Sequence, residues 1–173
     1  AKKSEELGRT ETIDTGKMLK ETRWQAKYIA DFFHFYAGCA DKISGETLPI
    51  DKPDLFVFTD REPLGVVAAV VPWNSQLFLV AVKIGPALAA GNAVVVKPAS
   101  DTPLSAIKLV EILLEAGFPP EAVSVVTGSG STIGDAVASD PRVRKISFTG
   151  SRDVGEHICR TAGLKKVTME LGS

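Results

Sequence analysis

Short segments of strand character alternate with longer segments of helical pattern from Pro63 to the end of the sequence. The first is apolar at every position from Gly65 to Val71, which is typical of a parallel strand covered on both faces. The whole set predicts strands at 65–71, 93–96, 123–126, 144–148 and 167–169, and helices at 77–90, 103–116, 131–139 and 152–162. Asp101 or Thr102 is expected to cap the helix at 103–116. Five strands alternating with four helices predict an α/β fold with a doubly wound, five-stranded parallel sheet.

The first 62 residues show two other patterns. Helices are expected to about residue 43, with Gly16 ending a first short helix. In the second helix apolar residues recur every three or four positions and predict a buried stripe of Tyr28, Phe32, Phe35 or Tyr36, Cys39 and Ile43. Apolar runs at 47–50 and 55–59 predict a hairpin or a pair of edge strands. We therefore expect N-terminal helices at 1–44, a hairpin at 45–62 and the sheet domain at 63–173.

Composition excludes several classes of protein. The 173 residues are 45% hydrophobic and 24% charged, as in an ordinary globular domain. A formal net charge of -1 gives no general attraction to nucleic acid or to an anionic membrane. Residues 63–82 are uncharged and approach the length of a membrane span, but Pro72 and Asn74 would place a helix breaker and an amide near the bilayer centre. We therefore expect no nucleic-acid partner and no membrane association.

The two cysteines, Cys39 and Cys159, are far apart and have no second cysteine or histidine at ligand spacing. Neither a disulfide framework nor a metal site is therefore expected. The N-terminus has no apolar segment of the kind that a secretory signal needs, so a reducing, cytoplasmic setting fits best. The sequence does not begin with methionine, and we expect it to start inside a longer protein.

Residues whose side chains could bind ligands or take part in catalysis follow the ends of the predicted strands, where doubly wound sheets bind their ligands. An amide, an ammonium group, two glycine-rich turns and a carboxylate are expected at this edge, in the segments 72–74, 97–100, 127–130, 149–151 and 170–173.

Each of these segments also has a simpler explanation. The glycines Gly128, Gly130 and Gly134 do not have the spacing of the usual dinucleotide fingerprint, and a tight strand-to-helix turn explains them. Lys97 taken singly is a solvated charge, and Asn74 after a proline is a turn residue. Their combination therefore carries the functional hypothesis.

Four motifs in order resemble the aldehyde dehydrogenase superfamily: Pro72-Trp73-Asn74, Lys97-Pro98, Phe148-Thr149-Gly150-Ser151 and Glu170-Leu171-Gly172. The resemblance covers essentially the whole chain, including 14–17 and 61–67. It implies a Rossmann-like cofactor domain, with the hairpin at 45–62 extending into contacts of a homo-oligomer, either a dimer or a tetramer.

The resemblance also implies roles for individual residues. Asn74 matches the asparagine whose amide helps to hold the developing oxyanion, and Glu170 matches the glutamate that acts as general base in hydrolysis of a thioester. The residues implied in binding NAD or NADP are Val71, Pro72, Trp73, Lys97, Pro98, Ser100, Gly130, Gly134, Phe148, Gly150, Ser151, Val154 and Leu171.

The implied activity is oxidation of an aldehyde to a carboxylic acid through a cysteine thiohemiacetal and thioester. The family's nucleophilic cysteine lies downstream of the residues given, and neither Cys39 nor Cys159 matches it. Ser173 stands where the family motif continues with glycine. We therefore expect the cofactor-binding part of a larger enzyme, inactive as an isolated chain.

Two other hypotheses remain open at this point, a dinucleotide-binding module that catalyses nothing and a non-catalytic scaffold. The choice of cofactor is open too. Ser100 is neutral and Lys97 is cationic, so the site is expected to accept NADP alongside NAD, although the carboxylate of Asp101 could oppose the extra phosphate.

Overall fold

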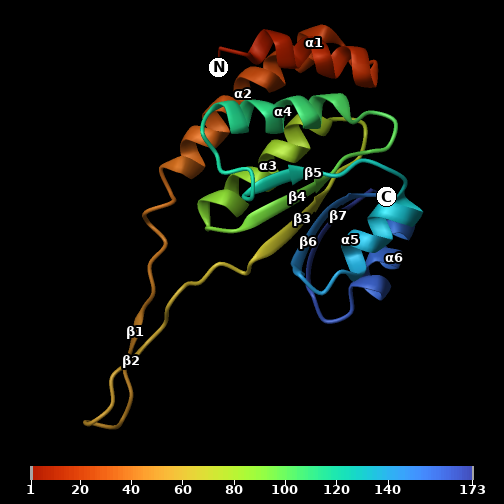
Figure 1. Ribbon diagram of the computed structural model, residues 1–173. Helices are drawn as coiled ribbons and strands as arrows, with labels where there is room; N and C mark the ends of the chain where they lie inside the picture. The colour runs from red at the N-terminus through yellow and green to blue at the C-terminus, as the bar shows by residue number, and fades with distance from the viewer. Residues whose placement is uncertain (1, 173) are drawn as a thin grey trace.

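A computed structural model describes residues 2–172 of the chain (Figure 1). Its centre is a parallel sheet of five strands, and the spatial order is β5-β4-β3-β6-β7. The first strand of the sheet in the sequence, β3, lies in the middle. The next two, β4 and β5, extend the sheet to one edge, and β6 and β7 form the other half. The predicted α/β fold with a doubly wound sheet is confirmed. The bounds of the strands are β3 (Val66–Val70), β4 (Ala93–Lys97), β5 (Val123–Val125), β6 (Val143–Gly150) and β7 (Lys166–Leu171).

Helices cover both faces of this sheet. On one face α3 (Gln76–Ala89) and α4 (Leu104–Glu115) pack on the strands, and α1 (Ser4–Thr15) and α2 (Leu19–Ala37) form a further layer (Figure 1). On the other face lie α5 (Asp135–Ser139) and α6 (Arg152–Ala162). The segment before α5 is a π-helical turn, η1 (Gly130–Gly134), where the sequence predicts an ordinary helix.

The middle strand β3 carries a core on each side. Neighbouring residues of a strand point to opposite faces, so Ala69 packs in the cluster under α3 and α4, and Ala68 packs with Ile146 and Phe148 under α6. Both alanines are fully buried. Both faces of β3 are thus buried, which explains why the sequence of this strand is apolar at every position.

The buried face of α2 matches the predicted stripe only in part. Phe32 and Tyr36 are half-buried beside Gly85 of α3. Thr22, Ala26 and Ile29 are buried, whereas Tyr28 and Phe35 are 42% and 64% exposed. The start of α2 lies close to α1: a Cβ on Gly8 would meet the Arg23 backbone at 3.0 Å, so small residues line this contact. The helix also ends at Ala37, so the last two residues of the predicted stripe, Cys39 and Ile43, lie outside it.

The cap of α4 also differs from the prediction. The backbone N–H groups of Leu104 and Ser105 donate to Oδ2 of Asp14, at 2.8 and 3.4 Å. Neither Asp101 nor Thr102 makes a side-chain cap of this helix. The capping group comes from α1, about 90 residues earlier in the chain, so a local sequence pattern could not reveal it.

The segment between α2 and β3 forms an arm that projects from the rest of the molecule (Figure 1). In it β1 (Thr47–Leu48) pairs antiparallel with β2 (Val57–Phe58), which confirms the predicted hairpin. Phe56 and Phe58 are exposed, and their ring centroids lie 5.8 Å apart. Within the described part of the chain, the helices are all too short or too polar to cross a membrane.

Candidate functional site

All five strands of the sheet are parallel, so their carboxyl ends lie at one edge. The register places Val70 opposite both Lys97 and Phe148. On the far side of β6, Thr149 is opposite Glu170. Residues that are separated by up to a hundred positions in the sequence therefore meet here, and two adjoining cavities open at this edge.

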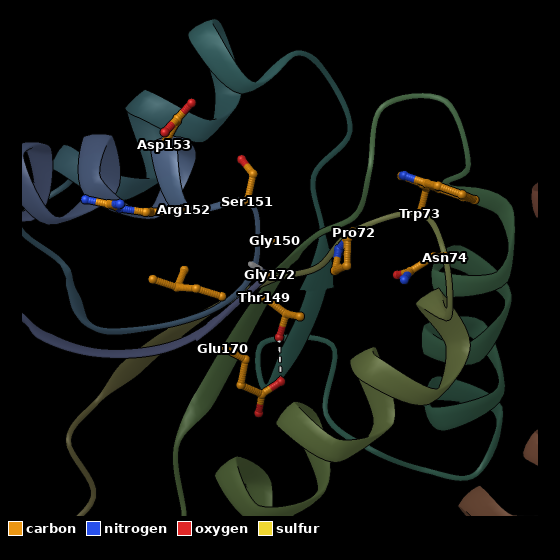
Figure 2. Close-up of a pocket in the computed structure, with 11 residues that line it drawn as sticks. Pro72, Trp73, Asn74, Thr149, Gly150, Ser151, Arg152, Asp153, Glu170 and Gly172 are labelled. Atoms are coloured by element: carbon orange, nitrogen blue, oxygen red, sulfur yellow. Dashed lines mark hydrogen bonds between the residues drawn. The ribbon is translucent and has the colours of Figure 1, made fainter.

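The first cavity, of about 600 Å³, contains both predicted catalytic residues (Figure 2). Asn74 is on the loop after β3, and Glu170 is near the end of β7. The beginning of α6 forms a third wall. The lining residues are Pro72, Trp73, Asn74, Thr149, Gly150, Ser151, Arg152, Asp153, Glu170, Leu171 and Gly172.

Two neighbours to which the sequence analysis assigned no role, Thr149 and Lys83, lie beside the carboxylate of Glu170. Thr149 Oγ1 donates a hydrogen bond to Glu170 Oε2 at 2.8 Å, drawn as a dashed line in Figure 2. Lys83 Nζ lies 3.9 Å from the same oxygen and donates to Ser147 Oγ at 3.3 Å. Burial lowers the pKa of the Lys83 ammonium, and the charge of Glu170 opposes this shift. Lys83 is the only charged residue of α3, and that isolation was the signal available in the sequence.

The second cavity, of about 530 Å³, lies between the strand ends and helices α5 and α6. It shares Pro72, Gly150 and Ser151 with the first cavity. Most of the predicted cofactor residues line it, namely Val71, Pro72, Lys97, Gly130, Gly134, Phe148, Gly150, Ser151 and Val154.

The remaining predicted cofactor residues lie elsewhere. Trp73 and Leu171 line the first cavity, and Pro98 and Ser100 line neither of the two. Pro98 is fully buried, and its carbonyl oxygen accepts from Lys97 Nζ at 2.9 Å. Ser100 Oγ donates to the Gly128 carbonyl at 2.9 Å and so joins the loops that follow β4 and β5. The position of the family glycine, Ser173, lies outside the described residues.

Two features of the second cavity would suit a phosphate-containing ligand, namely an open glycine wall and the start of a helix. A Cβ on Gly130 or Gly134 would have no neighbouring atom within 4 Å, so the absence of side chains keeps this wall open. Ser151 Oγ accepts from the Val154 N–H at 3.4 Å and begins α6, whose N-terminal N–H groups favour a phosphate.

Lys97 supplies a buried donor to the same cavity. The residue is 6% exposed, and burial lowers the pKa of the ammonium group. Its hydrogen bond to the Pro98 carbonyl holds the ammonium near the sheet edge. Such a group can donate to the hydroxyls of a ribose.

His157 is a further residue that the sequence analysis did not single out. Its Nε2 atom lies 2.7 Å from Asp135 Oδ1 and links α6 to α5 across the wall of the second cavity. The free cysteines, Cys39 and Cys159, line neither of these two cavities.

Comparison with known proteins agrees with this geometry. The family model described as "Aldehyde dehydrogenase family" matches residues 1–173. A (Z)-2-((N-methylformamido)methylene)-5-hydroxybutyrolactone dehydrogenase of Acinetobacter baylyi is 48% identical over 99% of this chain and 36% of its own length. Aldehyde dehydrogenase, cytosolic 1, of Rattus norvegicus is 52% identical over 96% of this chain and 34% of its own length. The chain thus spans about a third of the length of these relatives.

Solved structures of related enzymes also match the fold of this chain. Betaine aldehyde dehydrogenase of Staphylococcus aureus, in complex with NAD+, is similar with a TM-score of 0.95 and 39% identity, over 99% of this chain and 34% of that one. An NADP-dependent enzyme of E. coli is similar with a TM-score of 0.95 and 40% identity, over 98% and 36%. By the match along its whole length and the agreement in fold, the chain belongs to the aldehyde dehydrogenase family.

Proposed function

We propose that this chain is the cofactor-binding part of an NAD(P)+-dependent aldehyde dehydrogenase, which oxidises an aldehyde to a carboxylic acid. One observation carries the proposal. The amide of Asn74 and the carboxylate of Glu170 line the first cavity. This cavity adjoins the second cavity, here called the groove, along Pro72, Gly150 and Ser151. An acid-base group and a neutral donor therefore lie beside a site shaped for a dinucleotide.

The residues of the groove fit NAD+ or NADP+. Lys97 would donate to a ribose, the start of α6 at Ser151 would hold the diphosphate, and the apolar wall at Val154 would cover the base. The bound cofactor would accept a hydride from the substrate carbon. The related S. aureus structure contains NAD+, and the E. coli relative is described as NADP dependent.

In this proposal Asn74 donates a hydrogen bond to the oxyanion that develops on the substrate carbonyl. Such a preorganised donor lowers the barrier because it stabilises charge that exists only in the transition state. Glu170 takes a proton from the water that hydrolyses the acyl intermediate, and Thr149 orients its carboxylate. The nucleophilic cysteine would lie in a part of the enzyme outside this chain.

The finer features of the proposal concern cofactor choice and assembly. The neutral Ser100 would leave room for the 2′-phosphate of NADP+, so we infer that both cofactors are accepted. The projecting arm, with Phe56 and Phe58 exposed, would serve contacts between copies in a cytoplasmic homo-oligomer.

The test is Glu170→Gln in the full-length protein, followed by stopped-flow measurement of NAD(P)H formation. Acylation and deacylation are separate steps, so the variant should retain a first-turnover burst and lose most of its steady turnover. Steady turnover equal to that of the parent would remove Glu170 from the mechanism. The alternative, a dinucleotide-binding module, predicts cofactor binding with no burst from either protein.

A further inference from the structure

The end of α1 and the turn after it contact the starts of α3 and α4 through three polar residues spaced three apart, Glu11, Asp14 and Lys17. Glu11 Oε2 accepts from the Leu77 N–H at 3.1 Å, and Lys17 Nζ donates to Ser75 Oγ at 2.6 Å. As described above, Asp14 accepts from the first N–H groups of α4. One short segment therefore binds the beginnings of both α3 and α4.

These contacts are unusual for a helix that only packs on its neighbours. Glu11 is fully buried, and its second oxygen, Oε1, has no hydrogen-bond partner within residues 2–172. Burial raises the pKa of this carboxyl, and the nearby Ser105 hydroxyl, the Leu77 N–H and the Lys17 charge oppose the shift. Apolar residues of similar volume would fill such a place at a lower desolvation cost. The N-terminus of α3, which the Glu11 carboxyl faces, offsets only part of this cost.

Lys17 contacts the residue next to the candidate oxyanion donor, Asn74. Ser75, the partner of Lys17, follows Asn74 and makes no hydrogen bond that caps its own helix. The turn at Gly16, where φ is +75°, reverses the chain so that Lys17 can reach this hydroxyl. The next residue, Gln76, is buried and accepts from the Ala99 N–H at 3.0 Å. The loop of Asn74 is thereby fixed to α1 on one side and to the loop after Lys97 on the other.

We propose that Lys17, together with Glu11, is a positioning residue that holds the Asn74 loop in the geometry needed for catalysis. This inference rests on the proposed function, in which the Asn74 amide holds an oxyanion. The segment 14–17 then has a role at the site although none of its atoms lines the catalytic cavity. A donor displaced by a fraction of an ångström loses much of its effect on the transition state.

The test uses steady-state kinetics of the full-length protein with Lys17→Met, Lys17→Arg and Ser75→Ala. Lys17→Met and Ser75→Ala should each lower kcat on the order of tenfold, with the Kd for NAD+ and the midpoint of thermal unfolding close to those of the parent. Lys17→Arg keeps a donor and should recover most of the activity. Lys3→Met is the matched control, because Lys3 also lies beside α1 but pairs with exposed Glu115 at 3.0 Å.

Repeating the Lys17 substitution in an Asn74→Ala protein distinguishes failure of this inference from failure of the proposed function. If Lys17 acts through Asn74, Lys17→Met should cost little further activity in an Asn74→Ala protein. Independent, additive losses would overturn the positioning role. If Asn74→Ala alone leaves kcat unchanged, the proposed function fails instead. If Lys17→Met does not fold, Ser75→Ala removes the same hydrogen bond from the other side, and parent-like kcat in that variant overturns the inference.

Discussion

Lys83 Nζ lies 3.9 Å from Glu170 Oε2, which joins the third helix to the last strand at the edge of the sheet. The lysine side chain is 3% exposed and that of Glu170 is 57% exposed, so a buried cation faces an open carboxylate. Thr149 donates to the same oxygen. The carboxylate is therefore held from two directions, although water can reach it.

The first prediction concerns Thr149. Thr149→Val keeps the shape of the side chain and removes the donor to Glu170, so the carboxylate should be less well oriented. A hydrogen bond to a charged group is worth about 1.5 kcal/mol or more, and we expect the deacylation rate to fall roughly tenfold. Single-turnover acylation should be unaffected. Thr149→Ser retains the hydroxyl and should behave as the parent; equal losses in both variants would contradict the role of this bond.

The second prediction concerns the wall of the groove. Gly134→Ala places a methyl group where the structure has no atom within 4 Å. Alanine is favoured over glycine in a helix by up to about 1 kcal/mol, so the free energy of unfolding should rise. The Kd for NAD+ should rise as well if the cofactor lies against this wall. Calorimetry of unfolding and titration with NAD+ measure the two effects, and unchanged cofactor affinity would place the cofactor elsewhere.

The third prediction concerns cofactor choice. Ser100→Glu would bring a carboxylate to the loop after β4, where it can accept from ribose hydroxyls and repel a 2′-phosphate. The ratio of kcat/KM for NADP+ to that for NAD+ should fall at least tenfold, a difference of about 1.4 kcal/mol. Ser100→Gln has the same size without the charge and controls for loss of the hydrogen bond to Gly128. A similar ratio in both variants would show that charge at this position does not select the cofactor.

The fourth prediction concerns stability and pH. Burial raises the pKa of Glu11 above the usual 4.5, so folding favours its protonated form. The associated stability is fully present below the unfolded-state pKa and is lost as pH rises through the folded-state pKa. Glu11→Gln retains an acceptor for the Leu77 N–H and removes this loss. Denaturant titrations across the range above pH 4.5 should show a flatter profile for the variant, and parallel profiles would contradict the assignment.

The fifth prediction concerns the arm. Phe56 is 74% exposed and directly precedes β2, in the arm that projects from the rest of the molecule (Figure 1). Phe56→Asp should reduce the sedimenting mass of the full-length protein at micromolar concentration, because a charge in an apolar contact is costly to bury. Ile13→Asp, at a residue 80% exposed on α1, is the matched control. A parent protein that sediments as a monomer would remove the assembly role altogether.

The strands, most helices and the hairpin could be predicted because their signals are local. Alternation of apolar runs and helical periods, with glycines at the boundaries, reflects backbone sterics that each segment carries with it. The convergence of Asn74, Lys97, Ser151 and Glu170 also followed, since parallel strands present their carboxyl ends at one edge.

Other features required the folded chain. The cap of α4 by Asp14, the contact of Lys17 with Ser75 and the pairing of Lys83 with Glu170 join residues 58 to 90 positions apart. The buried face of α2 depends on how closely α1 approaches it, and small residues rather than aromatic rings fill that contact. Local periodicity identifies which segments form helices and strands, but it contains no information about which distant polar group will satisfy a helix end or a buried charge. That choice is made by packing, because an N–H group or an ammonium removed from water must find its partner among whatever side chains the fold brings near.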